Sequence, residues 1–155
     1  MQNIMIQAHK LLLQKNKTVA VAESCTGGLV SSLLTSLPGS SAYFLLGVAA
    51  YSNKAKRDIL KIPVSLLKKH GAVSSQVALA MAVNVRKLAG ADFGIGITGI
   101  AGPGGGTPDK PVGTVYIAGV STSAKICKKF HFRASRSGVR ARSADAALSL
   151  LEDLL

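Results

Sequence analysis

Short apolar runs alternate along this chain with segments that carry the hydrophobic period of a helix. The runs over residues 18–22, 43–51 and 92–98 predict buried strands, and helical patterns lie between them. Strands separated by helices are typical of parallel pairs, which need a long crossover connection. Two further strands, over residues 112–121 and 125–132, are separated only by a short turn. We therefore expect a layered α/β/α fold with a mixed, mostly parallel sheet.

We expect a single domain over residues 1–155. No linker divides the chain, and 155 residues is an ordinary length for one domain. The apolar runs are too short to cross a bilayer, and the N-terminus lacks the pattern of a signal peptide. These features favour a cytoplasmic protein with no membrane association. Helices are predicted over residues 4–13, 29–37, 54–60, 64–70, 75–89 and 136–155.

Acidic and metal-binding side chains are scarce in this sequence. It has 7 Asp and Glu against 19 Lys and Arg, a formal net charge of +12, and 3 widely spaced His. Cys25 and Cys127 form no CxxC pair, and the carboxylates lack the spacing of a metal loop. We therefore expect neither a metal nor a cofactor. If the protein is an enzyme, its nucleophile and base come from Ser, Thr, Cys, Lys or Tyr.

A polar, glycine-rich joint follows the first strand, with the sequence Glu23-Ser-Cys-Thr-Gly-Gly28. Such a joint presents free backbone N–H groups at the start of the next helix, where they can stabilise an oxyanion or bind an anion. Ser24 is the candidate nucleophile, and Cys25 is a competing one. A purely structural interpretation stays open, in which Ser24 or Thr26 caps the helix and the two glycines allow close packing.

Two lysines stand in a basic segment after the second strand, Tyr51-Ser-Asn-Lys-Ala-Lys-Arg57. Burial and neighbouring cations lower the pKa of a lysine, so that its neutral form can act as a base. The alternative is a solvated helix start. In the last predicted helix, Arg136 and Arg140 are four residues apart and share a face that could hold a phosphate.

A long glycine-rich loop, Thr98-Gly-Ile-Ala-Gly-Pro-Gly-Gly-Gly106, follows the third strand. It matches neither the Walker A motif nor a dinucleotide-binding motif. Loops of this length in a compact domain are often functional, because their backbone amides can surround a ligand.

Together these motifs resemble the CinA C-terminal domain, the competence/damage-inducible protein family whose active members are nicotinamide-nucleotide amidohydrolases (NMN deamidases). The resemblance runs from about Thr18 to the C-terminus, in the family's order. The domain that precedes it in longer members is absent from this sequence, so we expect the stand-alone form. The matching segments are Ala22-Glu-Ser-Cys-Thr-Gly-Gly28, Pro38-Gly-Ser-Ser-Ala-Tyr-Phe44, Tyr51-Ser-Asn-x-Ala-Lys56, His70-Gly-Ala-Val-Ser74, Thr98-Gly-Ile-Ala-Gly-Pro-Gly-Gly-Gly106 and Lys110-Pro-Val-Gly-Thr-Val-Tyr116.

The resemblance implies a Ser/Lys hydrolase. Ser24 would be the nucleophile, Lys56 the general base, and Tyr51 a hydrogen-bonding partner that orients or relays between them. In the family, Gly-Asp usually precedes the arginine aligned with Arg136, whereas this chain has Ala134-Ser135, so Arg136 and Arg140 both remain candidates for holding the phosphate. The substrate-binding residues that we expect are Cys25, Thr26, Gly27, Gly28, Thr98, Gly99, Arg136 and Arg140.

The implied reaction converts nicotinamide mononucleotide (NMN) into nicotinate mononucleotide and ammonia through an acyl-enzyme. The expected partner is thus a phosphorylated pyridine nucleotide, and a homo-oligomer is expected. Backbone N–H groups between Thr26 and Gly28 would stabilise the oxyanion. The basic composition also leaves open a non-catalytic module that binds nucleotide or nucleic acid, linked to competence or DNA damage, or a sensor of a phosphorylated ligand. The low aromatic content, 5% with no Trp, disfavours single-strand binding by base stacking.

Overall fold

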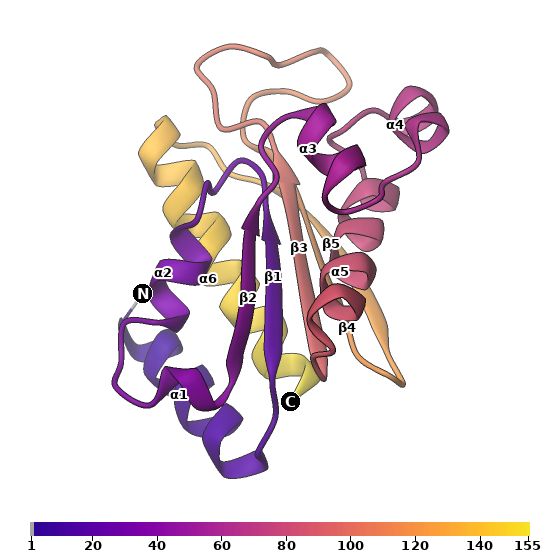
Figure 1. Cartoon of the computed structure of the whole chain (residues 1–155). Coiled ribbons are helices and arrows are strands. Elements are labelled where there is room, and N and C mark those ends of the chain that lie inside the picture. The colour runs from indigo at the N-terminus through magenta and orange to yellow at the C-terminus, as the bar shows by residue number, and fades with distance from the viewer. Residues whose placement is uncertain (1) are drawn as a thin grey trace.

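The computed structural model describes residues 2–155, and the description that follows concerns these residues (Figure 1). Five strands form one sheet in the order β2-β1-β3-β4-β5. β1 pairs in parallel with β2 and with β3, whereas the β3–β4 and β4–β5 pairs are antiparallel. The strands are β1 (Val19–Glu23), β2 (Phe44–Ala49), β3 (Phe93–Gly99), β4 (Thr114–Val120) and β5 (Lys125–His131).

The prediction of an α/β fold with a mixed sheet is confirmed. The sheet is less parallel than expected, because two of its four strand pairings are antiparallel. The chain passes from β3 to β4 through a loop and from β4 to β5 through a turn, without a crossover helix. β4 therefore runs antiparallel to β3, and β5 runs antiparallel to β4.

Helices cover both faces of this sheet, as predicted. In Figure 1, α1, α2 and α6 lie on one side of the strands, and α3, α4 and α5 lie on the other. α2 is shorter than expected, because the hydroxyls of Thr35 and Ser36 donate to the carbonyls of Ser31 and Leu33 at its end. The helices are α1 (Gln2–Lys15), α2 (Leu29–Leu34), α3 (Asn53–Asp58), α4 (Val64–His70), α5 (Ser75–Ala89) and α6 (Arg136–Leu154), with a short 3-10 helix η1 (Ser40–Ala42) before β2.

The core is divided by the sheet according to the alternation of side chains along each strand. In β1, Val19 and Val21 pack into the cluster formed with α1, α2 and α6, whereas Ala20 and Ala22 pack into the cluster beneath α5. β3 carries glycine at the two positions that contact α5, Gly94 and Gly96. A Cβ at Gly96 would lie 2.3 Å from the Ala78 carbonyl oxygen, so α5 lies against the bare backbone of the strand.

Replacing Gly96 by alanine is therefore expected to destabilise the fold by about 1–3 kcal/mol, the usual range for overpacking a core. The new methyl would meet backbone atoms of α5, which can yield only if the helix moves. Urea unfolding measures the change. Gly104→Ala is the control, because a Cβ at Gly104 meets nothing within 4 Å; equal unfolding midpoints for the two variants would contradict the close packing.

The carboxyl ends of β1, β2 and β3 meet at the same edge of the sheet, because these three strands are parallel. Figure 1 shows the joint after β1, the start of α3, the loop after β3 and the start of α6 gathered at this edge. In open α/β sheets, this is where ligands bind. Within residues 2–155, no helix is both long enough and apolar enough to cross a membrane.

Candidate active site

Ser24 lies at the point where β1 leaves the sheet. Its backbone N–H donates to the Ile97 carbonyl at 3.0 Å, so the strand is held to β3 up to this residue. The chain then turns through Gly27 (φ +59°) and Gly28 (φ +97°) into α2. These values fall in the left-handed region, which favours glycine. The turn leaves Ser24 buried at the carboxyl end of the sheet.

Glu23, which the sequence did not single out, caps α2. Its fully buried carboxylate accepts hydrogen bonds from the N–H groups of Gly28 (3.0 Å), Val30 (3.1 Å) and Ser31 (2.8 Å). The sequence signal was available, since carboxylates favour helix N-termini. The interpretation of Ser24 or Thr26 as the cap is wrong: the Thr26 hydroxyl is buried without a hydrogen-bond partner among the described residues.

This cap also changes the expected oxyanion site. The Gly28 N–H is taken by Glu23, and the Gly27 N–H donates to the Ser24 carbonyl at 3.1 Å. The expectation that the amides of both glycines are free to stabilise an oxyanion is therefore wrong. The amides of Cys25 and Thr26 lie beside the Cys25 thiol instead. Among the described residues these two amides have no backbone acceptor, which makes them the remaining candidates in this turn for binding an oxyanion.

The side chain of Lys56 contacts the Ser24 hydroxyl. Its amine lies 2.8 Å from Ser24 Oγ and donates to the carbonyls of Ala50 (3.0 Å) and Tyr51 (3.2 Å). The residue is 1% exposed. Burial lowers the pKa of Lys56, an effect that the nearby Cys25 partly opposes. None of the salt bridges among the described residues involves this amine, so no carboxylate holds it in the charged form.

The position of helix α3 directs Lys56, and not Lys54, toward Ser24. The Ser52 hydroxyl caps the helix by accepting from the Ala55 N–H at 3.0 Å. Residues 54 and 56 then lie about 200° apart around the helix axis. Lys54 consequently points outward, with 78% of its side chain exposed, and pairs with Asp58 at 2.7 Å.

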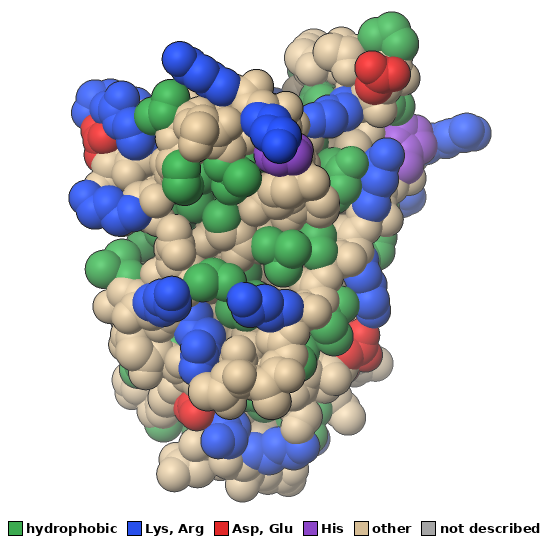
Figure 2. Space-filling model, turned by 90° about the vertical axis from the view of Figure 1, so that its right-hand side faces the viewer, with side chains coloured by type: hydrophobic (Ala, Val, Ile, Leu, Met, Phe, Trp, Pro, Cys, Tyr) green, Lys and Arg blue, Asp and Glu red, His purple; other side chains and the backbone are tan. Residues whose placement is uncertain are grey.

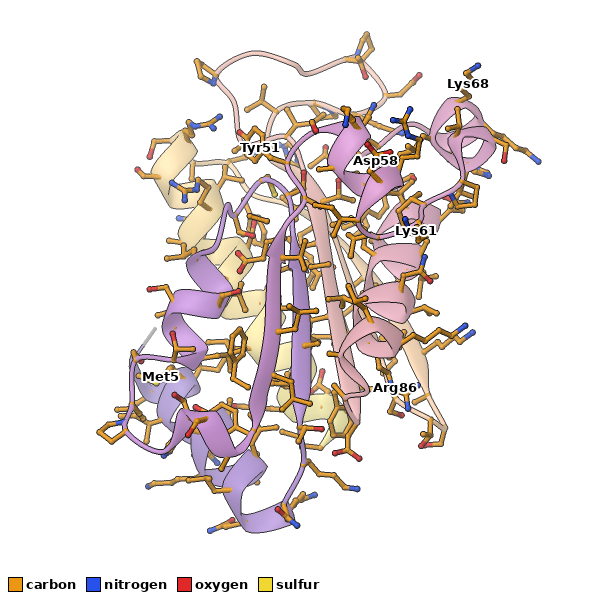
Figure 3. The ribbon with its side chains drawn as sticks, viewed as in Figure 1. Met5, Tyr51, Asp58, Lys61, Lys68 and Arg86 are labelled. Atoms are coloured by element: carbon orange, nitrogen blue, oxygen red, sulfur yellow. The ribbon has the colours of Figure 1, made fainter. Side chains whose placement is uncertain are left out.

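Tyr51 does not lie between Ser24 and Lys56, where the resemblance implied a relay. Its carbonyl accepts a hydrogen bond from Lys56, but the residue is 56% exposed and its phenol accepts a hydrogen bond from Arg136 at 2.8 Å. Figure 3 shows Tyr51 near the carboxyl end of the sheet, below the loop that follows β3. The phenol does not lie between the amine and the hydroxyl, since these two groups touch directly.

The two arginines of α6 have different positions. Arg136 lines the cavity beside Ser24, and its guanidinium donates to the Gly102 carbonyl at 2.7 Å. Arg140, one turn later, donates to the Thr26 carbonyl at 2.8 Å and does not line that cavity. Ser135 caps α6 by accepting from the Gly138 N–H at 3.3 Å. Ser135, which stands where the resemblance implies an acid, thus begins the helix that carries both arginines.

The loop after β3 forms the far wall of the site. Thr98 is buried, and its hydroxyl donates to the Ala72 carbonyl at 2.8 Å instead of pointing to open space. Lys110, later in the loop, donates to the His70 carbonyl at 2.9 Å. A Cβ at Gly99 would lie 2.7 Å from Val115 Cγ2, so only glycine fits there. The loop is thereby tied to the segment between α4 and α5.

These elements enclose a cavity of about 290 Å³, close to the smallest volumes typical of small-molecule sites. The charged side chains that line it are Lys56 and Arg136, and both are basic. The cavity therefore suits an anionic ligand. Sequence reasoning missed Asn53, Ala72 and Val73 as lining residues. The full lining is Ser24, Cys25, Tyr51, Asn53, Lys56, Ala72, Val73, Thr98, Gly99, Ile100, Ala101, Gly102, Gly104, Gly105 and Arg136.

Cys25 is a poor competitor for Ser24. Burial raises the pKa of its thiol to about 11, although its own amide, that of Thr26 and the Lys56 amine act in the opposite direction. The reactive form of a cysteine is the thiolate. At neutral pH Cys25 is therefore a neutral, buried thiol beside the serine.

The CinA C-terminal domain model matches residues 1–155 of this chain. The chain belongs to the CinA C-terminal domain family. It is 52% identical over 146 residues to a putative competence-damage inducible protein of Thermoanaerobacter pseudethanolicus, covering 93% of this chain and 35% of that protein. It is 49% identical over 145 residues to a CinA-like protein of Citrifermentans bemidjiense, covering 94% and 35%. The chain thus spans about a third of the length of these curated CinA relatives.

Solved CinA structures share the fold of the whole chain. The competence/damage inducible protein CihA from Agrobacterium tumefaciens superposes with a TM-score of 0.95 at 36% identity, covering 98% of this chain and 93% of that one. A CinA superfamily protein from Escherichia coli gives 0.94 at 32% identity, covering 99% and 89%. The family recognised from the motifs is confirmed, whereas the catalytic and binding roles of the individual residues stay predictions.

Proposed function

We propose that this CinA domain is an amidohydrolase that converts NMN into nicotinate mononucleotide and ammonia through an acyl-enzyme on Ser24. The observation that carries the proposal is the 2.8 Å contact between the buried Lys56 amine and Ser24 Oγ, with no carboxylate paired to that amine among the described residues. A serine becomes a strong nucleophile when an adjacent base takes its proton. The names of its relatives, competence-damage inducible protein and CinA-like protein, specify no activity, so the proposal rests on the geometry of the site.

The surroundings of Lys56 suit a neutral amine. A neutral amine has two N–H donors and one lone pair, and the carbonyls of Ala50 and Tyr51 are acceptors for the two donors. In this form the lone pair of the amine can accept the proton of the Ser24 hydroxyl, whose oxygen lies 2.8 Å away. The lowered pKa of Lys56 favours this form. The lysine is thus prepared to accept a proton as the serine attacks.

In the first half-reaction, Lys56 takes the hydroxyl proton while Ser24 Oγ bonds to the carboxamide carbon. The amide oxygen becomes an oxyanion, for which the amides of Cys25 and Thr26 are the candidate donors; one good donor stabilises such a charge by roughly 3 kcal/mol. When the tetrahedral intermediate collapses, the C–N bond breaks, and the protonated Lys56 returns its proton to the leaving nitrogen, which departs as ammonia.

In the second half-reaction, water replaces ammonia and the same groups act in reverse order. Lys56 takes a proton from the water as its oxygen bonds to the acyl carbon. The ester bond to Ser24 Oγ then breaks, and Lys56 protonates the serine. Nicotinate mononucleotide leaves with the new oxygen in its carboxyl group.

Arg136 is the proposed ligand of the phosphate. A guanidinium has five N–H donors, and the described contacts of Arg136, to Gly102 and Tyr51, use one N–H on each terminal nitrogen. The remaining donors can bind phosphate oxygens in the cavity that this side chain lines. Arg140 lies outside the cavity, where its hydrogen bond to the Thr26 carbonyl would stabilise the turn after β1.

Arg136→Met is expected to raise KM for NMN about 10- to 100-fold, the effect of losing a charged hydrogen bond of roughly 1.5–3 kcal/mol. The same variant is expected to change KM for nicotinamide riboside, which lacks the phosphate, by less than about threefold, because no phosphate contact is lost. Steady-state kinetics with both substrates give the comparison. Arg142→Met is the control, since Arg142 is exposed on the same helix. A similar rise with both substrates would contradict the role in phosphate binding.

Product analysis by chromatography tests the proposed reaction. Nicotinate mononucleotide is the expected product, whereas free nicotinamide would mean that the glycosidic bond breaks instead. Saturable binding of NMN without conversion would identify a ligand sensor. Binding of DNA that falls steeply with salt and is unchanged by Ser24→Ala, again without conversion of NMN, would favour a nucleic-acid-binding module.

A further inference from the structure

We propose that Lys110 is a positioning residue for substrate binding, because its amine holds the loop between β3 and β4, residues 100–113, over the catalytic cavity. The inference rests on the proposed function, since it concerns how the same cavity holds NMN. Lys110 does not line the cavity itself. Its amine donates to the carbonyl of His70, the last residue of α4, at 2.9 Å. This hydrogen bond keeps one wall of the cavity in place, and the affinity for substrate depends on it.

The wall concerned is a segment with little buried surface. Figure 1 shows the loop arching over the carboxyl end of the sheet. Gly102, Gly104 and Gly105 of this loop line the cavity, and residues 103–109 are all exposed. A segment with few buried apolar contacts opens at low cost in free energy. The position of the loop therefore depends on the individual hydrogen bonds that it makes to neighbouring elements.

Two basic side chains connect the loop to helices on either side of the cavity. Arg136 of α6 donates to the Gly102 carbonyl at 2.7 Å, and Lys110 donates to the His70 carbonyl of α4. α6 and α4 lie on opposite faces of the sheet, as Figure 1 shows. The loop therefore spans the cavity between two attachment points, and Lys110 provides the attachment on the side of α4.

The backbone of Lys110 is itself fixed within the loop. The Thr107 N–H donates to the Lys110 carbonyl at 2.9 Å, and the Lys110 N–H donates to the Thr107 hydroxyl at 3.0 Å. Pro111 restricts the backbone conformation of the residue before it, which is Lys110. The lysine therefore extends from a defined turn, and its hydrogen bond to His70 positions that turn relative to α4.

Val112 transmits the position of this turn to the part of the loop that lines the cavity. A Cβ at Gly102 would lie 2.5 Å from Val112 Cγ1, and one at Gly106 would lie 2.8 Å from the Val112 nitrogen. Val112 thus packs against residues 102–106, and it stands two residues after Lys110. The position of Lys110 is therefore coupled to that of the glycines that line the cavity.

The end of α4 offers an acceptor that suits this amine. The last carbonyls of a helix have no partner within the helix, and His70 carries one of them. Gly71 leaves room for the contact, since even a Cβ there would lie 3.4 Å from Lys110 Nζ. Ala72 and Val73, which follow directly, line the cavity. The contact thus joins two parts of the cavity wall that are distant in the sequence.

Steady-state kinetics of the wild type, Lys110→Met and Lys110→Arg test this role. We expect Lys110→Met to raise KM for NMN about tenfold, which is within the range for losing one hydrogen bond from a charged donor. Its kcat should change by less than about twofold, because the wall binds substrate and transition state alike. Lys110→Arg keeps a charged donor and should bring KM back to within about threefold of the wild-type value. An unchanged KM in Lys110→Met, or no recovery in Lys110→Arg, would overturn the proposal.

Lys69→Met is the matched control for the loss of charge. Figure 2 shows Lys and Arg side chains spread over the side that carries α4 and α5, with few acidic side chains between them. Removing any one of these charges weakens the attraction of an anionic substrate. Lys69 stands beside His70, is exposed, and takes part in none of the salt bridges among the described residues. We expect its KM to stay within about twofold of the wild-type value; an equal rise in both variants would overturn the role of the hydrogen bond.

Hydrogen exchange of the ligand-free protein separates this inference from the catalytic proposal. In Lys110→Met, the hydrogen-bonded amides of the loop, among them Thr107 and Gly113, should exchange about threefold faster or more, because the loop opens more often. Amides of β1 should keep their wild-type rates. This measurement needs no turnover, so a wild type that releases no ammonia would contradict the catalytic proposal alone. Unchanged exchange in residues 100–113 of Lys110→Met would overturn the role of Lys110, whatever the activity.

Discussion

Replacing Lys56 by methionine is expected to lower kcat for ammonia release from NMN by about a thousandfold. A positioned general base contributes roughly 100- to 10,000-fold to a rate, and no other amine is hydrogen-bonded to Ser24 Oγ among the described residues. Methionine keeps the length and apolar character of the buried side chain, so the variant should fold. Steady-state kinetics at a fixed pH give the ratio of the two rates.

Lys54→Met separates this role from a general effect of charge. Lys54 stands two residues earlier on the same helix, is exposed and pairs with Asp58. Its replacement removes one positive charge near the site but no contact to Ser24. We expect kcat to change by less than about threefold, because exposed ion pairs contribute little. Equal losses in the two variants would show that α3 acts through its charge and that Lys56 is not the base.

Replacing Ser24 by alanine is expected to have the largest effect on activity, a loss of about ten-thousandfold or more. Removing a nucleophile leaves only the rate enhancement that comes from binding and from the oxyanion site. The Ser24 hydroxyl makes its hydrogen bond to Lys56, so the variant keeps the backbone of the turn. NMN should still bind, and calorimetry can measure its Kd apart from the lost turnover.

Ser32→Ala is the matched control for this variant. Ser32 lies on α2, just beyond the same turn, and is exposed, so its loss should leave kcat unchanged. In the double variant Ser24→Ala/Lys56→Met, the loss should be no greater than in Ser24→Ala alone, because the two side chains act as one unit. Independent, additive losses would mean that Lys56 acts on a group other than Ser24.

The order of elements and the place of the site follow from local patterns. The apolar run over residues 18–22 lies within one residue of β1, and the polar joint after it does lie at the carboxyl end of the sheet. Both are local properties, since strand periodicity and turn residues act over a few positions. The motif order was also sufficient to recognise the family.

What the sequence did not reveal depends on contacts between distant segments. Glu23 caps α2 only because the turn at the two glycines returns the helix to the end of its own strand. The Tyr51 phenol meets Arg136, 85 residues later in the chain, and this contact turns it away from Lys56. The choice between Lys54 and Lys56 depends on where α3 begins and on which of its faces meets the sheet, which the composition of that segment does not determine.

The dependence of ammonia release on pH tests the central claim, that a neutral Lys56 activates Ser24. Burial lowers the pKa of Lys56, and the base acts only when deprotonated. For wild-type protein with NMN, kcat/KM should therefore rise about tenfold per pH unit on the acid side and level off below the ordinary lysine pKa of about 10.4. A protein that binds NMN but releases no ammonia between about pH 6 and pH 10, or a rate that does not rise with pH, would contradict the mechanism.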